Sequence, residues 1–308
     1  MITLGEGSTP LVEAPRLAAR YGLDVRLKLE LLNPTGSFKD RGMAVAVTRA
    51  LEDGARAVIC ASTGNTAAST AAYAARAGLR AVVLTPQGAV AAGKLAQARV
   101  LGALVLEVRG SFDQALTAAR ELAARGDFAL VNSVNPDRIE GQKRAALEIV
   151  EQLGGPPDAL ALPYGGGGNT RAYHAGFAEA DGALPRFVLG EASDRSGTLA
   201  SAIRIARPAH AEFVRAALEA TGGEVVSLSD DELRDAWRAL ARDEGVFCEP
   251  ASAAGVAALG RAPLETGSRV VCVITGNGLK DTEAAVRGLE PPRAVDPDPD
   301  AIAEAAAG

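Results

Sequence analysis

The chain has 308 residues, of which 48% are hydrophobic and 23% charged, and its net charge is −6. This length suits two domains or one large α/β domain, and the composition is ordinary for a globular protein. The chain has no basic run and no aromatic-plus-basic cluster, so we expect no nucleic-acid partner. No apolar run reaches membrane-spanning length and the N-terminus lacks signal-peptide features, so we expect a cytoplasmic protein without membrane contact.

Cysteine and histidine are too few and too scattered to indicate a disulfide framework or a metal site. The three cysteines, Cys60, Cys248 and Cys272, lie outside any CxxC pair, which favours buried thiols in a reducing compartment. The two histidines, His174 and His210, show no metal-ligand spacing. We therefore expect no metal, and acid–base chemistry that uses a residue other than histidine.

Short apolar strands alternate with helices along most of the chain. The predicted strands are 25–31, 57–60, 80–86, 103–108, 128–132, 158–164 and 269–275. The predicted helices are 38–53, 66–78, 91–102, 111–126, 136–154 and 170–180. Ser111 caps one of these helices and Pro136 opens another. The alternation predicts an α/β fold with mostly parallel sheets covered by helices, and the acidic, Pro-rich residues 291–308 are expected to form a mobile tail.

The stretch NPTGSFKDRG, Asn33–Gly42, places Lys39 in the first turn of a predicted helix, with Ser37 in the position of its cap. A lysine is unfavourable there because the helix dipole favours acidic side chains. One interpretation is that Lys39 points into water while Asp40 satisfies the dipole. The other is that Lys39 is made less basic so that it can act as a nucleophile.

Polar residues or glycines follow five of the predicted strands. They are Lys39, Ser62–Thr66, Asn132 with Ser133, Gly165–Asn169, and Thr275. In open parallel sheets, ligands bind at the carboxyl ends of the strands. Each loop alone is explained as a turn, but their coincidence at one edge favours a binding site.

Four glycines and an asparagine, Gly165–Asn169, lie between a predicted strand and a predicted helix. Backbone N–H groups and the helix dipole can hold a phosphate there. The dinucleotide fingerprint is incomplete, because Thr170 stands where its last glycine should be. A reactive lysine together with a phosphate loop fits pyridoxal phosphate, whose aldehyde needs a lysine and whose phosphate needs such a loop.

Six stretches resemble the threonine synthases, which are pyridoxal-phosphate enzymes of fold type II. They are LGEGSTPL, NPTGSFKDRGM, ASTGNTAAS, LVNSVNPDRIEGQ, FCEPASAA and TGNGLKD, and they run in the family's order to about Asp281. The resemblance implies two α/β domains with the cofactor in the cleft between them. We expect a large domain of residues 1–42 and 136–308, a smaller inserted domain of residues 43–135, and a homodimer.

The resemblance also implies the roles of site residues. Lys39 would form the Schiff base with the cofactor, Asn65 would contact its phenolic oxygen and Thr275 its pyridine nitrogen. Gly165, Gly166, Gly167, Gly168 and Asn169 would hold the cofactor phosphate. Ser62, Thr63 and Thr66 would hold the substrate carboxylate. The substrate phosphate would be bound by Asn132, Ser133 and Arg138, with Ser62 and Thr66.

The chain departs from the family's pattern in three places. The family commonly has Asn and Ala among the glycines of the phosphate loop, whereas this loop is all glycine before Asn169. The segment Gly190–Thr198 is shorter than expected, which puts one wall of the site in doubt. Arg207 stands where the family usually keeps a small or amide residue.

The activity implied is the conversion of O-phospho-L-homoserine and water to L-threonine and phosphate. Two alternatives remain open. A serine or threonine dehydratase, or a β-replacement enzyme, would share the cofactor residues without needing the second phosphate site. A non-catalytic phosphometabolite-binding protein would need no Schiff-base lysine.

Overall fold

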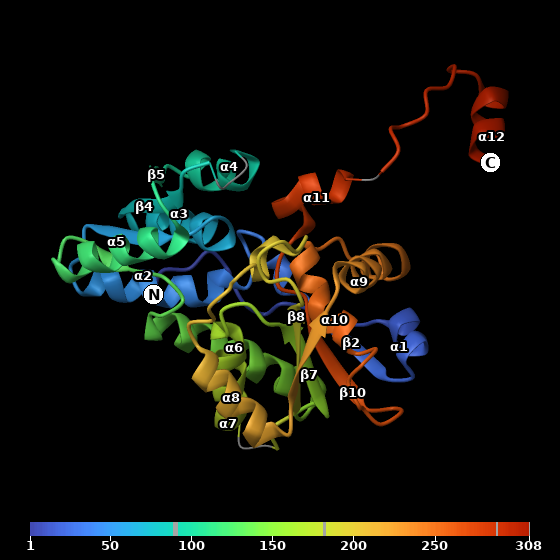
Figure 1. Cartoon of the computed structure of the whole chain (residues 1–308), viewed down its shortest axis with the longest axis horizontal. Coiled ribbons are helices and arrows are strands. Elements are labelled where there is room, and N and C mark those ends of the chain that lie inside the picture. Colours follow the sequence, from blue (N-terminus) through green and yellow to red (C-terminus); the bar gives the residue numbers. More distant parts are fainter. Residues whose placement is uncertain (89–91, 181–182, 288, 308) are drawn as a thin grey trace.

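Two separate β-sheets organise the chain (Figure 1). The computed structural model describes residues 1–88, 92–180, 183–287 and 289–307. The larger sheet has the order β1-β2-β10-β7-β8-β9 and only β1 is antiparallel. Its strands are β1 (Leu11–Glu13), β2 (Asp24–Lys28), β7 (Ala159–Pro163), β8 (Arg186–Ala192), β9 (Glu224–Leu228) and β10 (Arg269–Val273).

The smaller sheet is entirely parallel and has the order β5-β4-β3-β6. Its strands are β3 (Ala57–Ala61), β4 (Arg80–Pro86), β5 (Leu104–Val108) and β6 (Ala129–Leu130). The central strands of both sheets are buried and rich in Val, Ile, Leu and Ala, as expected where helices cover both faces. The predicted fold class, mostly parallel α/β, is confirmed.

Helices follow most of the strands. They are α1 (Pro15–Tyr21), α2 (Lys39–Glu52), α3 (Asn65–Ala77), α4 (Ala92–Val100), α5 (Phe112–Ala124), α6 (Pro136–Leu153), α7 (Gly168–Glu179), α8 (Ala211–Thr221), α9 (Asp230–Asp243), α10 (Ala254–Ala258), α11 (Thr282–Val286) and α12 (Pro299–Ala307). Ser111 caps α5 in a capping box with Gln114, and Pro136 opens α6 after the cap Asn135, as predicted. At the end of the chain, α12 lies away from the body (Figure 1).

Two local predictions are wrong. The strand predicted to reach Leu31 ends at Lys28, and Glu30–Leu32 forms a 3₁₀ turn. The Glu30 carboxylate accepts hydrogen bonds from the buried side chains of Thr9 and Arg41, which hold it away from the sheet. Ser37 does not cap α2, whose N-cap is Phe38 without any side-chain cap. Instead, Ser37 pairs with Gly276 in an isolated bridge, which joins the start of α2 to the end of β10.

The sequence patterns assigned no element to residues 181–268, where the structure has β8, α8, β9, α9 and α10. One signal was available, because Ser229 and Glu232 form a capping box at the start of α9. The strand β9 is short and contains an exposed Ser227, so its apolar run is weak. Antiparallel β1, with three residues, was also missed.

Helices α2 and α6 cross at two glycines, Gly42 and Gly141. A Cβ atom on Gly141 would clash with the backbone carbonyl of Arg41, and a Cβ atom on Gly42 would lie 2.8 Å from the Arg138 Nε atom. Backbones can approach so closely only where no side chain intervenes. This crossing fixes the first turn of α2, which carries Lys39, against α6, which carries Arg138.

We predict that Gly141→Ala destabilises the protein by about 1–3 kcal/mol, the range typical of overpacking. The matched control is Gly260→Ala, because a Cβ atom there would lie 3.6 Å from the Tyr21 ring, an ordinary contact. The free energy of unfolding in urea measures both changes. Equal stability of the two variants would contradict the close crossing.

Candidate active site

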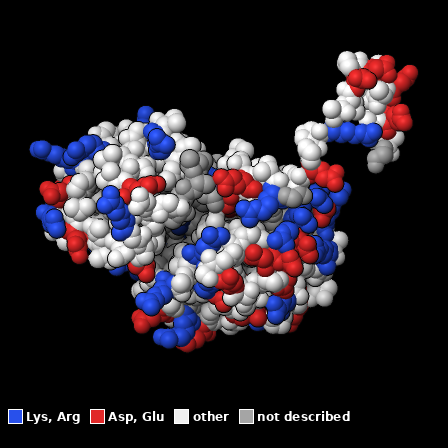
Figure 2. All heavy atoms as spheres, turned by 45° about the horizontal axis from the view of Figure 1, so that its top comes forward, with Lys and Arg blue, Asp and Glu red and all other residues white. Residues whose placement is uncertain are grey.

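One large cavity lies where the carboxyl ends of both sheets face each other. Its volume is about 1630 Å³. The surface is hollowed between the two lobes of the molecule (Figure 2). Its lining includes every predicted site residue except Arg138: Lys39, Ser62, Thr63, Asn65, Thr66, Asn132, Ser133, Gly165, Gly166, Gly167, Gly168, Asn169 and Thr275. Loops far apart in the sequence are therefore brought together, as the strand-end argument predicted.

Lys39 is the first residue of α2 and lines the cavity. Burial and the positive charge of Arg138 lower the pKa of its amine, the carboxylate of Glu249 opposes the shift, and the resulting pKa is about 7. The amine is therefore largely neutral just above neutral pH, which nucleophilic attack requires. Of the two interpretations left open by the sequence, the structure favours the less basic lysine over the solvent-exposed one.

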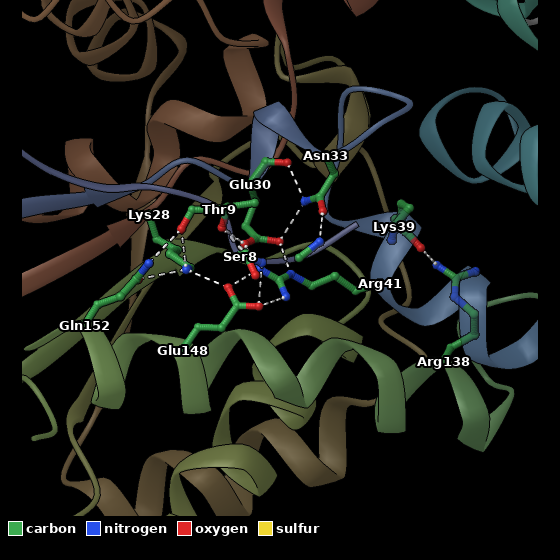
Figure 3. A network of polar contacts seen from close by, with 11 residues as sticks. Ser8, Thr9, Lys28, Glu30, Asn33, Lys39, Arg41, Arg138, Glu148 and Gln152 are labelled. Atoms are coloured by element: carbon green, nitrogen blue, oxygen red, sulfur yellow. Dashed lines mark hydrogen bonds and ion pairs between the residues drawn. The ribbon is translucent and has the colours of Figure 1, made fainter. Parts of the chain in front are cut away.

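Arg138 lies beside Lys39 but outside the cavity wall (Figure 3). Its side chain is fully buried, with one guanidinium nitrogen 2.8 Å from the carbonyl oxygen of Val131 and another 3.4 Å from that of Lys39. The Nε–H group has no hydrogen-bond partner among the described residues. Burial lowers the pKa of the guanidinium to about 10, which leaves it charged at neutral pH. Its positive charge therefore lowers the pKa of Lys39 without lining the cavity.

A buried ionic network holds α2 two residues beyond Lys39 (Figure 3). Arg41 donates to Glu30 at 2.6 Å and to Glu148 of α6 at 2.6 Å. Lys28 of β2 donates to the other oxygen of Glu148 at 2.8 Å. Burial alone would raise the pKa of Glu148, but its bonds to Arg41 and Lys28 lower the pKa to about 2. Nothing in the local pattern indicated this network, because its members are distant in sequence.

The four-glycine loop leads into α7, whose N-cap is Gly167 with φ of 82°. A Cβ atom on Gly167 would lie 2.7 Å from Val214, so both the backbone conformation and the space require glycine there. The Asn169 side chain has a buried Nδ2 group without a partner among the described residues. Unpaired donors at a helix N-terminus fit a phosphate, so the loop is suited to the cofactor phosphate.

Asn65 opens α3 and donates from Nδ2 to both oxygens of Glu249, at 3.1 and 3.0 Å. Ser62 accepts from the backbone N–H groups of Gly64 and Ala67 through Oγ. Its hydroxyl hydrogen therefore stays available to a ligand. Sequence reasoning missed Glu249, although it lies in one of the matching stretches, because nothing in a single sequence indicates that it faces Asn65.

The loop after β6 is tied to both sheets. The Asn132 amide accepts from the backbone N–H of Ala61 at 3.0 Å and donates to the Ala61 carbonyl at 2.8 Å, so it extends the short ladder between β3 and β6. The Ser133 carbonyl lies 3.0 Å from Nε2 of His210, whose backbone N–H donates to Gly166. His210, which sequence reasoning left without a role, thus links Ser133 to the glycine loop.

Thr275 lies at the end of β10, and its hydroxyl is 3.0 Å from the hydroxyl of Ser252. Ser252 also accepts from the backbone N–H of Gly276 at 2.9 Å. These contacts hold Thr275 at the cavity wall, and the hydroxyl partner found for it among the described residues, Ser252, is neutral. Its hydroxyl can thus offer one neutral hydrogen bond, as the resemblance implied.

We predict that Lys39 in the cofactor-free protein reacts with an amine acylating reagent with a pH midpoint near 7. Below that pH the amine is protonated and unreactive. Lys143 is the internal control, because its bonds to Glu140 and Glu179 raise its pKa. Competitive labelling read by mass spectrometry gives both midpoints. A Lys39 midpoint at the ordinary value near 10.5 would contradict the site described above.

Comparisons with known proteins identify the family of this chain. A family model described as "Pyridoxal-phosphate dependent enzyme" matches residues 2–276. The chain is 49% identical to a threonine synthase from Synechocystis, over 99% of this chain and 86% of that protein. It is 50% identical to a threonine synthase from Mycobacterium tuberculosis, over 98% of this chain and 90% of that protein.

Among solved structures, O-ureido-L-serine synthase has a TM-score of 0.80 at 22% identity, and the match covers 97% of each chain. A likeness at this identity shows the shared fold alone. The sequence relatives are much closer and extend over nearly the whole chain. The chain belongs to the pyridoxal-phosphate-dependent enzymes and, within them, to the threonine synthase family.

Proposed function

We propose that the protein converts O-phospho-L-homoserine and water to L-threonine and phosphate, with pyridoxal phosphate as cofactor. One observation carries the proposal most directly. A lysine with a pKa of about 7 lies in one cavity between the glycine loop and the loop of Asn132 and Ser133. The relatives' names and their extent of match support the same reaction.

The cofactor supplies an electron sink that stabilises negative charge at the carbon atoms next to the amino group. Lys39 would bind its aldehyde, the N–H groups of Gly165–Asn169 would hold its phosphate, and Thr275 would offer a hydrogen bond to its ring nitrogen. The neutral hydroxyl of Thr275 would not enforce protonation of that nitrogen. Asn65 would contact the phenolic oxygen.

The chain's own residues then bind and reprotonate the substrate. Ser62, Thr63 and Thr66 hold its carboxylate with hydroxyl and backbone donors at the start of α3. Asn132 and Ser133 hold its phosphate from the cavity wall, with Ser62 and Thr66 contributing. Arg138 joins them by turning its guanidinium, whose Nε–H group has no partner among the described residues, from its buried place beside Lys39 towards the cavity. Lys39 would carry protons to and from Cα and Cβ of the substrate, because its pKa of about 7 suits both directions at neutral pH.

We also propose that the two sheets belong to two domains, residues 1–42 with 136–308 and residues 43–135. Each sheet has its own hydrophobic clusters, such as the one around Leu160 and Phe187 and the one around Ile59 and Leu84. Closure of the cleft between the domains would control the access of water to the site. We propose mobility for the tail 291–308, whose described residues 291–307 are mostly exposed.

We further propose that the protein works as a homodimer in the cytoplasm. The edge strand β5 exposes Leu104 and Leu106, an apolar surface that a second copy could cover. All three cysteines are free and buried, as suits a reducing compartment. No helix in the described part of the chain has the length and apolar character to cross a membrane. Sedimentation equilibrium measures the oligomeric state.

We predict that Arg138→Ala lowers kcat/KM for O-phosphohomoserine about ten- to a hundredfold, because a charged hydrogen bond to phosphate is worth roughly 1.5–3 kcal/mol. Part of the loss should appear in kcat, since phosphate is also the leaving group. Arg144→Ala is the control, because Arg144 is an exposed residue of the same helix.

The same assays on L-threonine and L-serine separate the alternatives. A dehydratase would prefer those substrates before the mutation and change little after it. Lys39→Ala should abolish threonine formation in a folded protein. A non-catalytic binding protein would instead show no turnover even before the mutation. Preference of the unmutated enzyme for serine or threonine would refute the proposed substrate.

A further inference from the structure

Glu249 is a buried carboxylate that lines the cavity, next to the 3₁₀ turn Pro250–Ala253. Its backbone N–H donates to the carbonyl of Gly276 at 2.9 Å. A Cβ atom on Gly276 would clash with the Glu249 side chain, so the glycine makes room for the carboxylate. The packing therefore holds Glu249 in one place, from which it accepts the Asn65 Nδ2 group at 3.1 and 3.0 Å.

The charge of Glu249 is not a source of stability. Burial raises its pKa, and the bond from Asn65 and the charges of Lys280 and Lys39 only partly offset this, while Asp281 adds to it. A carboxyl whose pKa is higher in the folded than in the unfolded state destabilises the fold at pH values above the unfolded pKa, and folding becomes more favourable as the pH falls. A residue that costs stability at neutral pH is explained better by the site than by the fold.

The contact settles the orientation of the Asn65 amide. In its ionised form Glu249 accepts hydrogen bonds and cannot donate them, so it faces the NH₂ end of the amide. One N–H of Asn65 points to Glu249 and the other remains for a ligand in the cavity. Without Glu249, the amide could rotate and present its oxygen, which would repel an anionic oxygen on the ligand.

We propose that Glu249 is a positioning residue, which fixes the Asn65 amide so that its second N–H faces the phenolic oxygen of the cofactor. This inference rests on the role proposed above for Asn65. Glu249 itself need not touch the cofactor. Its effect on cofactor binding should therefore pass through Asn65 and vanish when Asn65 is absent.

A double-mutant cycle on cofactor affinity tests this coupling. Equilibrium dialysis of the full-length holoenzyme against pyridoxal phosphate gives the dissociation constant for the unmutated protein, Asn65→Ala, Glu249→Ala and the double variant. Each single variant should bind about tenfold more weakly, as expected for a lost hydrogen bond to a charged group. The double variant should bind no more weakly than Asn65→Ala. The control Glu283→Ala removes an exposed carboxylate of the same cavity and should change the affinity less than twofold.

Two outcomes would overturn the inference in different ways. Glu249 would not act through Asn65 if the losses of affinity in the two single variants multiplied in the double variant. The same would follow if Glu249→Ala left the affinity unchanged. An unchanged affinity in Asn65→Ala would refute the role of Asn65 itself, and Glu249 would lose its function with it. A purely structural Glu249 would lower the melting temperature of the cofactor-free protein in the Glu249→Gln variant, whereas we expect the same or a higher melting temperature.

Discussion

The pairing of Arg41 with Glu30 and Glu148 is the interaction on which the site depends. It joins the 3₁₀ turn after β2, the first turn of α2 and helix α6, and the side chains of Glu30 and Arg41 are buried. Removing one partner of such a buried pair typically costs about 3–5 kcal/mol, because the other charge is left unpaired. Together with the glycine crossing of α2 and α6, this pairing fixes the position of Lys39, the first residue of α2. A lysine on a loop could not be held so firmly against the two sheets.

The low pKa of Lys39 follows from that placement. A helix start lacks four backbone partners, and here no side chain caps it, so the first turn of α2 keeps its partial positive charge. Arg138 adds a full charge from behind, and burial removes the water that would solvate an ammonium group. The same features that would weaken an ordinary helix start therefore produce the neutral amine that the chemistry uses. Asp40, which might have offset them, is turned to Thr35.

Local chemistry explains which parts of the fold could be predicted from the sequence. The boundaries of α5 and α6 follow from Ser111 and Pro136, whose effects reach only a few residues. The cavity lining followed from one rule about strand ends, which needs only the order of strands and loops. By contrast, the 3₁₀ turn at Glu30 depends on Arg41, eleven residues away, and on Glu148, much farther along the chain. A pattern confined to one segment cannot reveal such partners.

The functional residues that the sequence did not reveal share one property: they act across the cavity. Glu249 reaches Asn65 and His210 reaches Ser133, so each joins a loop of the small sheet to a loop of the large one. Both loops also line the cavity and carry the residues proposed to bind substrate. Any movement between the sheets must therefore change these contacts, and a ligand that bridges the same loops must favour one arrangement of the sheets over others. Substrate binding and the proposed closure would then be two effects of the same few hydrogen bonds, so they could not be assigned to separate parts of the chain.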